Sequence, residues 1–262
     1  MKYSIYQVDA FAESVFSGNP AAVCPLDQWL SDDMMQKIAM ENNLAETAFY
    51  VKQGRQYIIR WFTPKVEVDL CGHATLAAAF VLFNHGNHSG DVIHFHSPRS
   101  GDLMVTKQGE LLTLNFPTDV FGQIALNDEI LAAFDITPGL AFKGKTDYLL
   151  VFNTEEEIRQ ATPVLDAIAK LKGRGVMITA PGNEVDFVSR FFAPQSGIDE
   201  DPVTGSAHTT LIPYWSERLG KVELTAMQLS ERKGYLQCRY LNDRVEISGK
   251  GKLYLTGEIY LA

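Results

Sequence analysis

The chain of 262 residues is 46% hydrophobic and 21% charged, and it carries a net charge of −9. This composition is typical of a folded globular protein with enough residues for two domains of ordinary size. The acidic balance argues against binding to nucleic acid, and no apolar run reaches the roughly 20 residues that a membrane helix needs.

Apolar periodicity predicts mostly strands in the first half of the chain. Strands are expected at residues 2–10, 21–24, 44–51, 57–62, 91–96, 101–107 and 111–115. A helix is expected from residue 32 to 42, capped by the hydroxyl of Ser31. A second helix, residues 73–83, follows a turn at Gly72. Its side chains are apolar on nearly every side, which is typical of a helix enclosed by other elements.

The second half combines helices and strands. Helices are expected at residues 127–134, 154–160, 165–171 and 209–219. Strands are expected at residues 147–152, 176–179, 186–192, 224–230, 235–240, 244–248 and 252–260. Gly220 is the expected end of the last helix, and Pro213 is expected to kink it. Long strands with one enclosed helix in each half predict an α+β fold.

Two sequence motifs each occur twice, and the distance between the two copies is nearly the same for both. The turn at Gly72 has a counterpart at Gly205, 133 residues later, and the run RWFTP at 60–64 has a counterpart at 190–194, 130 residues later. We infer an internal duplication. It predicts two pseudo-symmetric domains, residues 1–116 and 117–262, each a strand-rich, barrel-like sheet around a central helix, with the last strand free to pair with the first domain. The two helix N-termini are expected to face a shared cleft.

The residues that differ between the halves are the better candidates for function. An offset of 130 carries Glu46 onto Val176, so this acid has no acidic counterpart, whereas Glu200 and Asp201 precede only the second turn. A lone carboxylate on a strand is more often a solvated surface group. The apolar neighbours of Glu46 favour a buried setting instead. A carboxylate held beside imidazole and hydroxyl groups is a candidate proton carrier.

Five phrases in this order resemble the PhzF (phenazine biosynthesis) family, which has the diaminopimelate-epimerase-like fold. They are GNPAAV at 18–23, ETAF at 46–49, RWFTP at 60–64, CGHAT at 71–75 and EDPVTGSAH at 200–208. The resemblance covers nearly the whole chain. The residues from Pro213 to Trp215 are similar to the branch named for animal MAWD-binding proteins.

The resemblance implies an isomerase that moves a proton on a small carboxylate-bearing substrate, with no metal and no organic cofactor. The essential glutamate of the family maps to Glu46, which is implied to act as general acid/base. The other residues implied are His73, Asp201 and Ser206 for catalysis, and Asn19, Gly72 and Gly205 for binding the substrate. The resemblance also implies a homodimer, and no partner other than the small-molecule substrate.

Two alternatives are open. Amino-acid racemases and epimerases of the same fold use two cysteines, and Cys71 occupies one such position. Thr204 occupies the other, and its hydroxyl is not acidic enough to replace a thiolate. The second alternative is a non-catalytic binding protein on this scaffold, in which His73 and Ser206 cap their helices and Asp201 is a turn residue.

Cysteine and histidine usage predicts neither disulfides nor a metal site. The chain has three cysteines, which are Cys24, Cys71 and Cys238. They are far apart and odd in number, as expected of free thiols in a reducing compartment. Four histidines are close in sequence, namely His85, His88, His94 and His96. They fall in a turn and a strand-like run, so surface imidazoles are expected. The N-terminus lacks the apolar centre of a signal peptide, and we expect a cytoplasmic protein.

Overall fold

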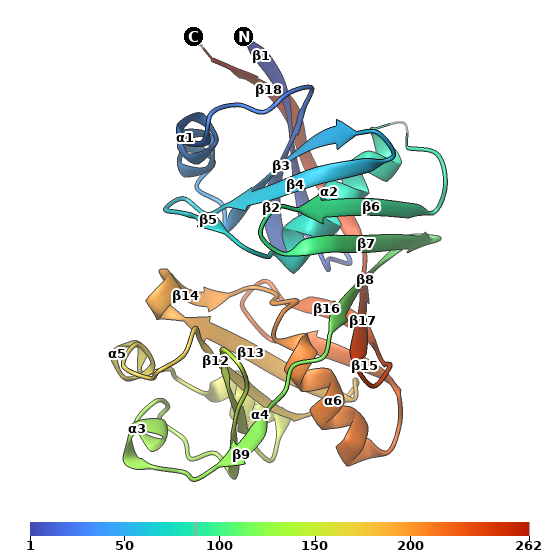
Figure 1. Ribbon diagram of the computed structural model, residues 1–262. Coiled ribbons are helices and arrows are strands. Elements are labelled where there is room, and N and C mark those ends of the chain that lie inside the picture. Colours follow the sequence, from blue (N-terminus) through green and yellow to red (C-terminus); the bar gives the residue numbers. More distant parts are fainter. Residues whose placement is uncertain (87, 262) are drawn as a thin grey trace. The chain divides into compact units, whose positions relative to one another are not determined.

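The computed structural model describes residues 1–86 and 88–261, which divide into two compact units (Figure 1). The first unit contains residues 1–115 together with the C-terminal segment from residue 248, and the second contains residues 116–247. The chain therefore crosses between the units twice. The C-terminal segment joins the first unit because its strand pairs with the N-terminal strand along almost its full length. None of the described helices is long and apolar enough to span a bilayer.

The first unit is a sheet with two helices. Its strands are β1 (Lys2–Ala10), β2 (Asn19–Leu26), β3 (Glu46–Gln53), β4 (Gln56–Phe62), β5 (Glu67–Val68), β6 (Val92–Ser97), β7 (Gly101–Gln108), β8 (Leu111–Pro117) and β18 (Gly251–Tyr260). Its helices are α1 (Asp32–Asn42) and α2 (Gly72–Asn84). The hydroxyl of Ser31 caps α1 by accepting a hydrogen bond from the Met34 amide, as expected from the sequence.

The second unit has shorter strands and more helical turns. Its strands are β9 (Gly122–Ile124), β10 (Leu140–Lys143), β11 (Tyr148–Val151), β12 (Val176–Pro181), β13 (Phe187–Ala193), β14 (Ile198–Asp201), β15 (Glu223–Gln228), β16 (Gly234–Tyr240) and β17 (Arg244–Gly249). Its helical elements are α3 (Asp128–Leu131), α4 (Glu155–Gln160), α5 (Leu165–Ile168), the short 3-10 helix η1 (Pro194–Ser196) and α6 (His208–Leu219).

Two expected helices of the second unit are wrong in length. The amphipathic runs at 127–134 and 165–171 form only α3 and α5, of four residues each. The first run leaves the helix because Phe134 forms an isolated β-bridge with Pro163 and packs into the core of the unit. Strands β9, β10 and β14 were not expected from the sequence. They are short, so their apolar residues give too few alternations to be recognised.

The two units repeat one order of strand pairing. In the first unit β1–β2 is antiparallel, β2–β3 parallel, β3–β4 and β4–β5 antiparallel, β4–β6 parallel and β6–β7 antiparallel. In the second unit β10–β11 is antiparallel, β11–β12 parallel, β12–β13 and β13–β14 antiparallel, β13–β15 parallel and β15–β16 antiparallel. The predicted α+β fold with two pseudo-symmetric parts is confirmed.

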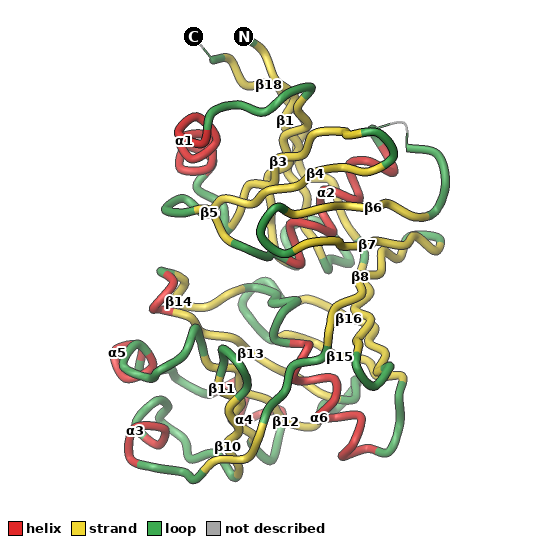
Figure 2. The backbone as a smooth tube through the Cα atoms, in the orientation of Figure 1, coloured by secondary structure: helices red, strands yellow, loops and turns green. Residues whose placement is uncertain are grey.

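In each unit the helix that follows the glycine turn, α2 or α6, packs against strands (Figure 2). In α2 every residue from Gly72 to Leu82 except Phe80 is buried, and the helix contacts β1, β2, β3 and β18. Its apolar surface has no polar face to turn to solvent, so it is stable only inside the unit. Helix α6 contacts β15 and β16. Pro213 lies inside it and has no amide hydrogen to donate to the Thr209 carbonyl. That carbonyl accepts a hydrogen bond from the Asp119 amide instead.

The repeated motif at residues 60–64 and 190–194 begins with an arginine that makes the same contact in both units. Arg60 donates from Nε and Nη2 to the two carboxylate oxygens of Glu67, at 2.7 and 2.8 Å. Arg190 makes the same pair of bonds to Glu200, at 2.7 and 2.9 Å. The guanidinium lies over Phe62 in one unit and over Phe192 in the other. The phrase is thus repeated because it fixes strand ends, a structural role.

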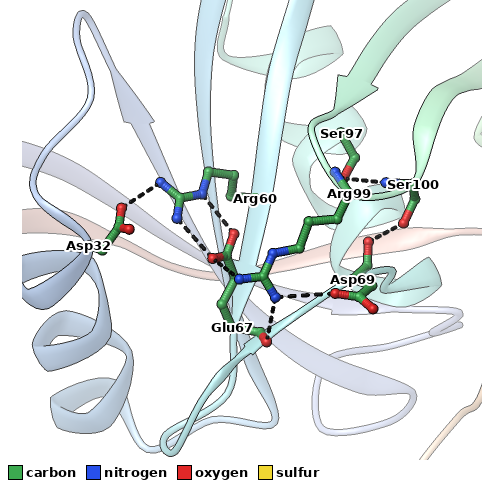
Figure 3. Close-up of polar contacts among 7 residues, drawn as sticks. All are labelled: Asp32, Arg60, Glu67, Asp69, Ser97, Arg99 and Ser100. Carbon is green, nitrogen blue, oxygen red and sulfur yellow. Dashed lines mark hydrogen bonds and ion pairs between the residues drawn. The ribbon is translucent and has the colours of Figure 1, made fainter.

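In the first unit this contact belongs to a larger ion-pair network (Figure 3). Arg99 donates to Glu67 at 2.8 Å and to the Asp69 carboxylate at 3.1 Å, and the Ser100 hydroxyl donates to the Asp69 carbonyl. The network holds residues 67–69, which lead directly into the start of α2. Hydrogen bonds to Glu67 also raise the pKa of Arg60.

Substitution Glu67→Gln is expected to lower the free energy of unfolding by about 2–4 kcal/mol, because it leaves two arginines without the carboxylate between them. The Glu67 side chain is only 12% exposed. Asp32→Asn is the matched control, since Asp32 contacts the same arginine with a side chain that is 78% exposed. It is expected to cost less than about 1 kcal/mol. Denaturant unfolding of the two variants measures the difference, and equal losses would contradict this assignment.

Candidate active site

Three elements of the first unit begin at the same place and bring polar side chains together. Glu46 is the first residue of β3, and Asn19 is the first residue of β2. The two strands are parallel with Ala21 opposite Glu46, so their starts lie at one edge of the sheet. Helix α2 starts nearby with Gly72, and His73 is its second residue. Asn19 is therefore a fully buried strand residue, because β2 begins two residues before the strand expected at 21–24.

His73 lies at the centre of this cluster. Its Nε2 atom is 3.1 Å from Oε2 of Glu46, an ion-pair distance, although the two groups are not aligned for a hydrogen bond. On the other side of the ring, Nδ1 is 3.2 Å from the Asn19 amide nitrogen and 3.5 Å from the Cys71 sulfur. The ring nitrogen Nε2 thus faces Glu46, and Nδ1 faces Asn19 and Cys71.

The cluster is buried and electrostatically coupled. Glu46 is 8% exposed and His73 4% exposed. Burial disfavours the imidazolium, but the Cys71 sulfur and the Glu46 carboxylate outweigh it, so the pKa of His73 is raised well above its usual value. Burial and the Glu46 charge raise the pKa of the Cys71 thiol, and the contact with His73 partly offsets this rise. A buried carboxylate beside an imidazole is an arrangement that can hold and pass a proton.

Cys71, His73 and Glu46 also form a group of potential metal ligands, whose donor atoms lie within 4.8 Å of one another. A bound zinc ion needs its ligands around one point, at about 2.0–2.3 Å from each. Here Cys71 approaches Nδ1 and Glu46 approaches Nε2, so the three groups form a row across the ring. This geometry suits a proton relay better than a metal centre. That the protein uses neither a metal nor an organic cofactor stays a prediction.

The second turn has a separate hydrogen-bond system in the second unit. The Thr204 hydroxyl donates to the Asp201 carboxylate at 2.5 Å, and the Gln228 side chain donates to the Asp201 carbonyl at 2.7 Å. Gln228 also accepts from the Thr204 amide. Gly205 is buried, whereas Ser206 is half-buried and accepts a hydrogen bond from Arg174 at 2.9 Å. Asp201 and Ser206 are thus held in place, in a unit other than that of Glu46 and His73.

The register of the sheets corrects the counterpart of Glu46. Thr47 pairs with Phe62 in the first unit, and Val176 pairs with Phe192 in the second. Thr47 and Val176 are therefore equivalent, and the residue equivalent to Glu46 is Gly175 instead of Val176. The difference arises because the β12–β13 hairpin is one residue longer than the β3–β4 hairpin. Glu46 still lacks an acidic counterpart, since neither residue is acidic.

His208 is equivalent to Thr75, and both serve the same purpose. The Thr75 hydroxyl bonds the Cys71 carbonyl at 2.5 Å, and Nδ1 of His208 bonds the Thr204 carbonyl at 2.9 Å. Each contact ties the start of an enclosed helix to its turn. Burial without an anionic neighbour lowers the pKa of His208 to about 4.

The two buried histidines are expected to titrate in opposite directions from about 6.5. An NMR pH titration of the imidazole Cε1–H signals should place the pKa of His73 above that value and the pKa of His208 near 4. His208 should then cost stability as the pH falls from about 6.5 to 4, because the unfolded chain binds its proton first. His73 should contribute stability that is lost as the pH rises through its raised pKa. Equal pKa values would contradict the assigned environments.

A family model described as phenazine biosynthesis-like protein matches residues 8–257. The chain belongs to this family. A Pseudomonas aeruginosa protein named as an uncharacterized isomerase is 50% identical over 261 residues, which cover 100% of both chains. A mouse protein named phenazine biosynthesis-like domain-containing protein 2 is 41% identical over 287 residues and 99% of both chains, consistent with the resemblance to an animal branch. The family resemblance of the five phrases is confirmed.

Solved structures show the same family and the same fold. A crystal structure of a PhzF-family protein from Enterococcus faecalis has a TM-score of 0.97 and 50% identity, covering 100% of both chains. The likeness of fold extends to a hydroxyproline epimerase from Agrobacterium vitis, with a TM-score of 0.63 and 9% identity over 98% of this chain and 92% of that one. The phenazine biosynthesis-like family thus shares the epimerase-like fold.

The sequence singled out Asn19, which the structure shows hydrogen-bonded to His73, but it missed one residue of these clusters. Arg174, which bonds Ser206, was not expected at all. The sequence feature that could have identified it is its position between Gly173 and Gly175, the second of which is the residue equivalent to Glu46.

Proposed function

We propose that this member of the phenazine biosynthesis-like family is an isomerase that moves a proton on a small carboxylate-bearing substrate, with Glu46 as general acid/base. The observation that carries the proposal is the buried Glu46 carboxylate, 3.1 Å from Nε2 of His73 at the start of an enclosed helix. Buried ionisable groups that perturb one another are more common at functional sites than elsewhere. The name of the Pseudomonas relative supports the reaction class.

In the proposed reaction Glu46 removes a proton from a carbon next to an unsaturated or carboxylate-bearing centre. The C–H electron pair delocalises into that centre, and negative charge develops on the substrate. The proton is then held on Glu46 and returned to another carbon, so the product is an isomer and nothing is oxidised or reduced. His73 would stabilise the developing charge in a buried site, where electrostatic interactions are stronger than in water.

The other predicted residues support this centre in different ways. Asn19 holds Nδ1 of His73, so we propose that it orients the imidazole instead of binding substrate directly. Asp201 and Ser206 keep their proposed roles in orienting substrate and stabilising charge. Gly72 and Gly205 would let a substrate carboxylate approach backbone amides at the helix starts. The homodimer and the cytoplasmic location stay predictions.

The racemase alternative is less well supported by the same geometry. Two-thiol chemistry requires a thiolate on each side of the substrate carbon, but burial and the charge of Glu46 raise the pKa of Cys71 and disfavour its thiolate. At the other position, the Thr204 hydroxyl donates to Asp201. The non-catalytic alternative is disfavoured by the cost of burying Glu46 and His73, which a binding scaffold does not need.

A solvent-exchange screen tests the proposal. Unsaturated and amino-substituted carboxylic acids are incubated with the protein in D₂O, and mass spectrometry detects deuterium incorporated into carbon. At least one acid is expected to gain deuterium, since a proton held on Glu46 can exchange with solvent before it is returned. If no acid gains deuterium and none is isomerised, the proposed reaction class is contradicted.

A further inference from the structure

The second unit carries a positive charge at the place where the first carries Glu46. Ser206 is equivalent to His73, because each follows the glycine of its turn. Glu46 faces His73 in the first unit, and in the second unit Nη2 of Arg174 donates to the Ser206 hydroxyl oxygen at 2.9 Å. Arg174 directly precedes Gly175, the counterpart of Glu46. The duplicated turns are therefore paired with side chains of opposite charge.

Arg174 is held in place by contacts of both its side chain and its backbone. Its Nε and Nη2 atoms donate to the two oxygens of the Asp147 carboxylate, at 3.0 and 2.5 Å, and the Asp147 side chain is only 5% exposed. The guanidinium lies over the ring of Phe191, 5.2 Å from its centroid. The backbone amide of Arg174 donates to the Thr146 carbonyl at 2.8 Å. These contacts fix both the chain and the side chain of Arg174.

The glycines on either side of Arg174 show how closely this segment packs. A Cβ atom on Gly173 would lie 2.8 Å from the Thr146 carbonyl oxygen, and one on Gly175 would lie 2.5 Å from the Phe191 ring. Neither position has room for a side chain. The side chain of Arg174 is nevertheless 38% exposed, so a solute can approach it.

These contacts define what Ser206 can offer to a ligand. Its oxygen accepts from a guanidinium, so its own proton is directed to a different acceptor. A hydroxyl polarised by a cation is a stronger donor than a neutral one, and a carboxylate is an acceptor only. We propose that Arg174, clamped by Asp147, positions and polarises Ser206 as the recognition group for the carboxylate of the substrate. This inference rests on the proposed function, to which it adds the residue pair that selects an anionic substrate.

Acetate, the simplest stable carboxylate probe, tests the pair directly. The intact protein is titrated with sodium acetate, with sodium chloride at equal ionic strength as reference, and the Ser206 amide and Arg174 Nε–H signals are followed by NMR. A saturable shift specific to acetate is expected. Arg174→Met should weaken acetate binding about tenfold or more, because charge-assisted bonds are lost. No saturable shift in the unsubstituted protein would overturn the proposal.

A matched control separates a local effect from general charge. Arg239→Met removes the same charge from the second unit, where Arg239 makes only long contacts of 3.9–4.0 Å, and should leave acetate binding unchanged. If Arg174→Met does not fold, Arg174→Lys keeps the charge but cannot clamp Asp147 with two bonds while donating to Ser206. Several-fold weaker binding is expected there, and unchanged affinity in the lysine variant would reject the positioning role.

The acetate titration does not depend on proton transfer. If Glu46→Gln retains deuterium exchange while acetate still binds through Arg174, the proposed function fails and the recognition pair stands. If Glu46→Gln loses exchange while acetate binding is indifferent to Arg174, the proposed function stands and the recognition pair fails.

Discussion

Glu46→Gln is expected to lower deuterium exchange into a substrate acid by about 10³-fold or more, with little change in folding. A positioned general acid/base contributes about 10²–10⁴ to a rate, and this residue is proposed to act in both steps. The amide keeps the size of the side chain but cannot take up a proton. Mass spectrometry of the acid identified in the exchange screen measures the loss, and thermal unfolding checks the fold.

The control for this variant is Glu41→Gln, the same substitution at an exposed position of α1 in the same unit. It is expected to keep full exchange. Full exchange in Glu46→Gln would remove the assignment of Glu46 as proton carrier. If Cys71→Ser stopped exchange instead, the racemase alternative would be favoured, because a thiol and not the carboxylate would then be moving the proton.

His73→Gln is expected to lower exchange by about 10²–10³-fold, because it removes the group that faces Glu46 and would stabilise developing charge. The pH profile should change as well. In the unsubstituted protein the rate is expected to fall as the pH rises through the raised pKa of His73, since the imidazolium is lost. That limb should be missing from the His73→Gln profile, as followed by exchange rates across neutral and alkaline pH.

His96→Gln provides the comparison, because His96 is on β6 with a side chain 41% exposed that pairs with the exposed Asp102. It should leave both the rate and the profile unchanged. A His73→Gln variant that keeps the alkaline limb would show that another group titrates there. An unchanged rate in the same variant would reduce His73 to a helix-start residue, as in the non-catalytic alternative.

Much of the candidate site was predictable because its signals are local. The glycine turn at Gly72 and the apolar run after it indicated an enclosed helix, and α2 is buried on nearly all sides. Glu46 was singled out because it lacks an acidic counterpart, and its apolar neighbours predicted the burial that the structure shows. The Glu46–His73 contact was not predictable from spacing alone, since it joins the start of a strand to the start of a helix.

The least predictable features depend on strand register. A one-residue difference between two hairpins shifted the counterpart of Glu46 from Val176 to Gly175, and with it the significance of Arg174. The contact from Asn19 to His73 spans 54 residues and follows from the parallel pairing of β2 with β3 together with the packing of α2 against both strands. No local pattern specifies such a pairing, because side-chain alternation marks a strand without naming its partner.

The sequence by itself determined the family, the duplication and the proton carrier to be tested, because these are written in short phrases and in the difference between two copies. The tertiary structure alone decided which groups surround that acid, and why Ser206 is paired with a cation. Hydrophobic periodicity acts over a few neighbouring residues, whereas the electrostatics of a buried side chain depend on whatever the sheet brings against it. For His73 and His208, two buried imidazoles of one chain, that environment alone shifts the pKa in opposite directions.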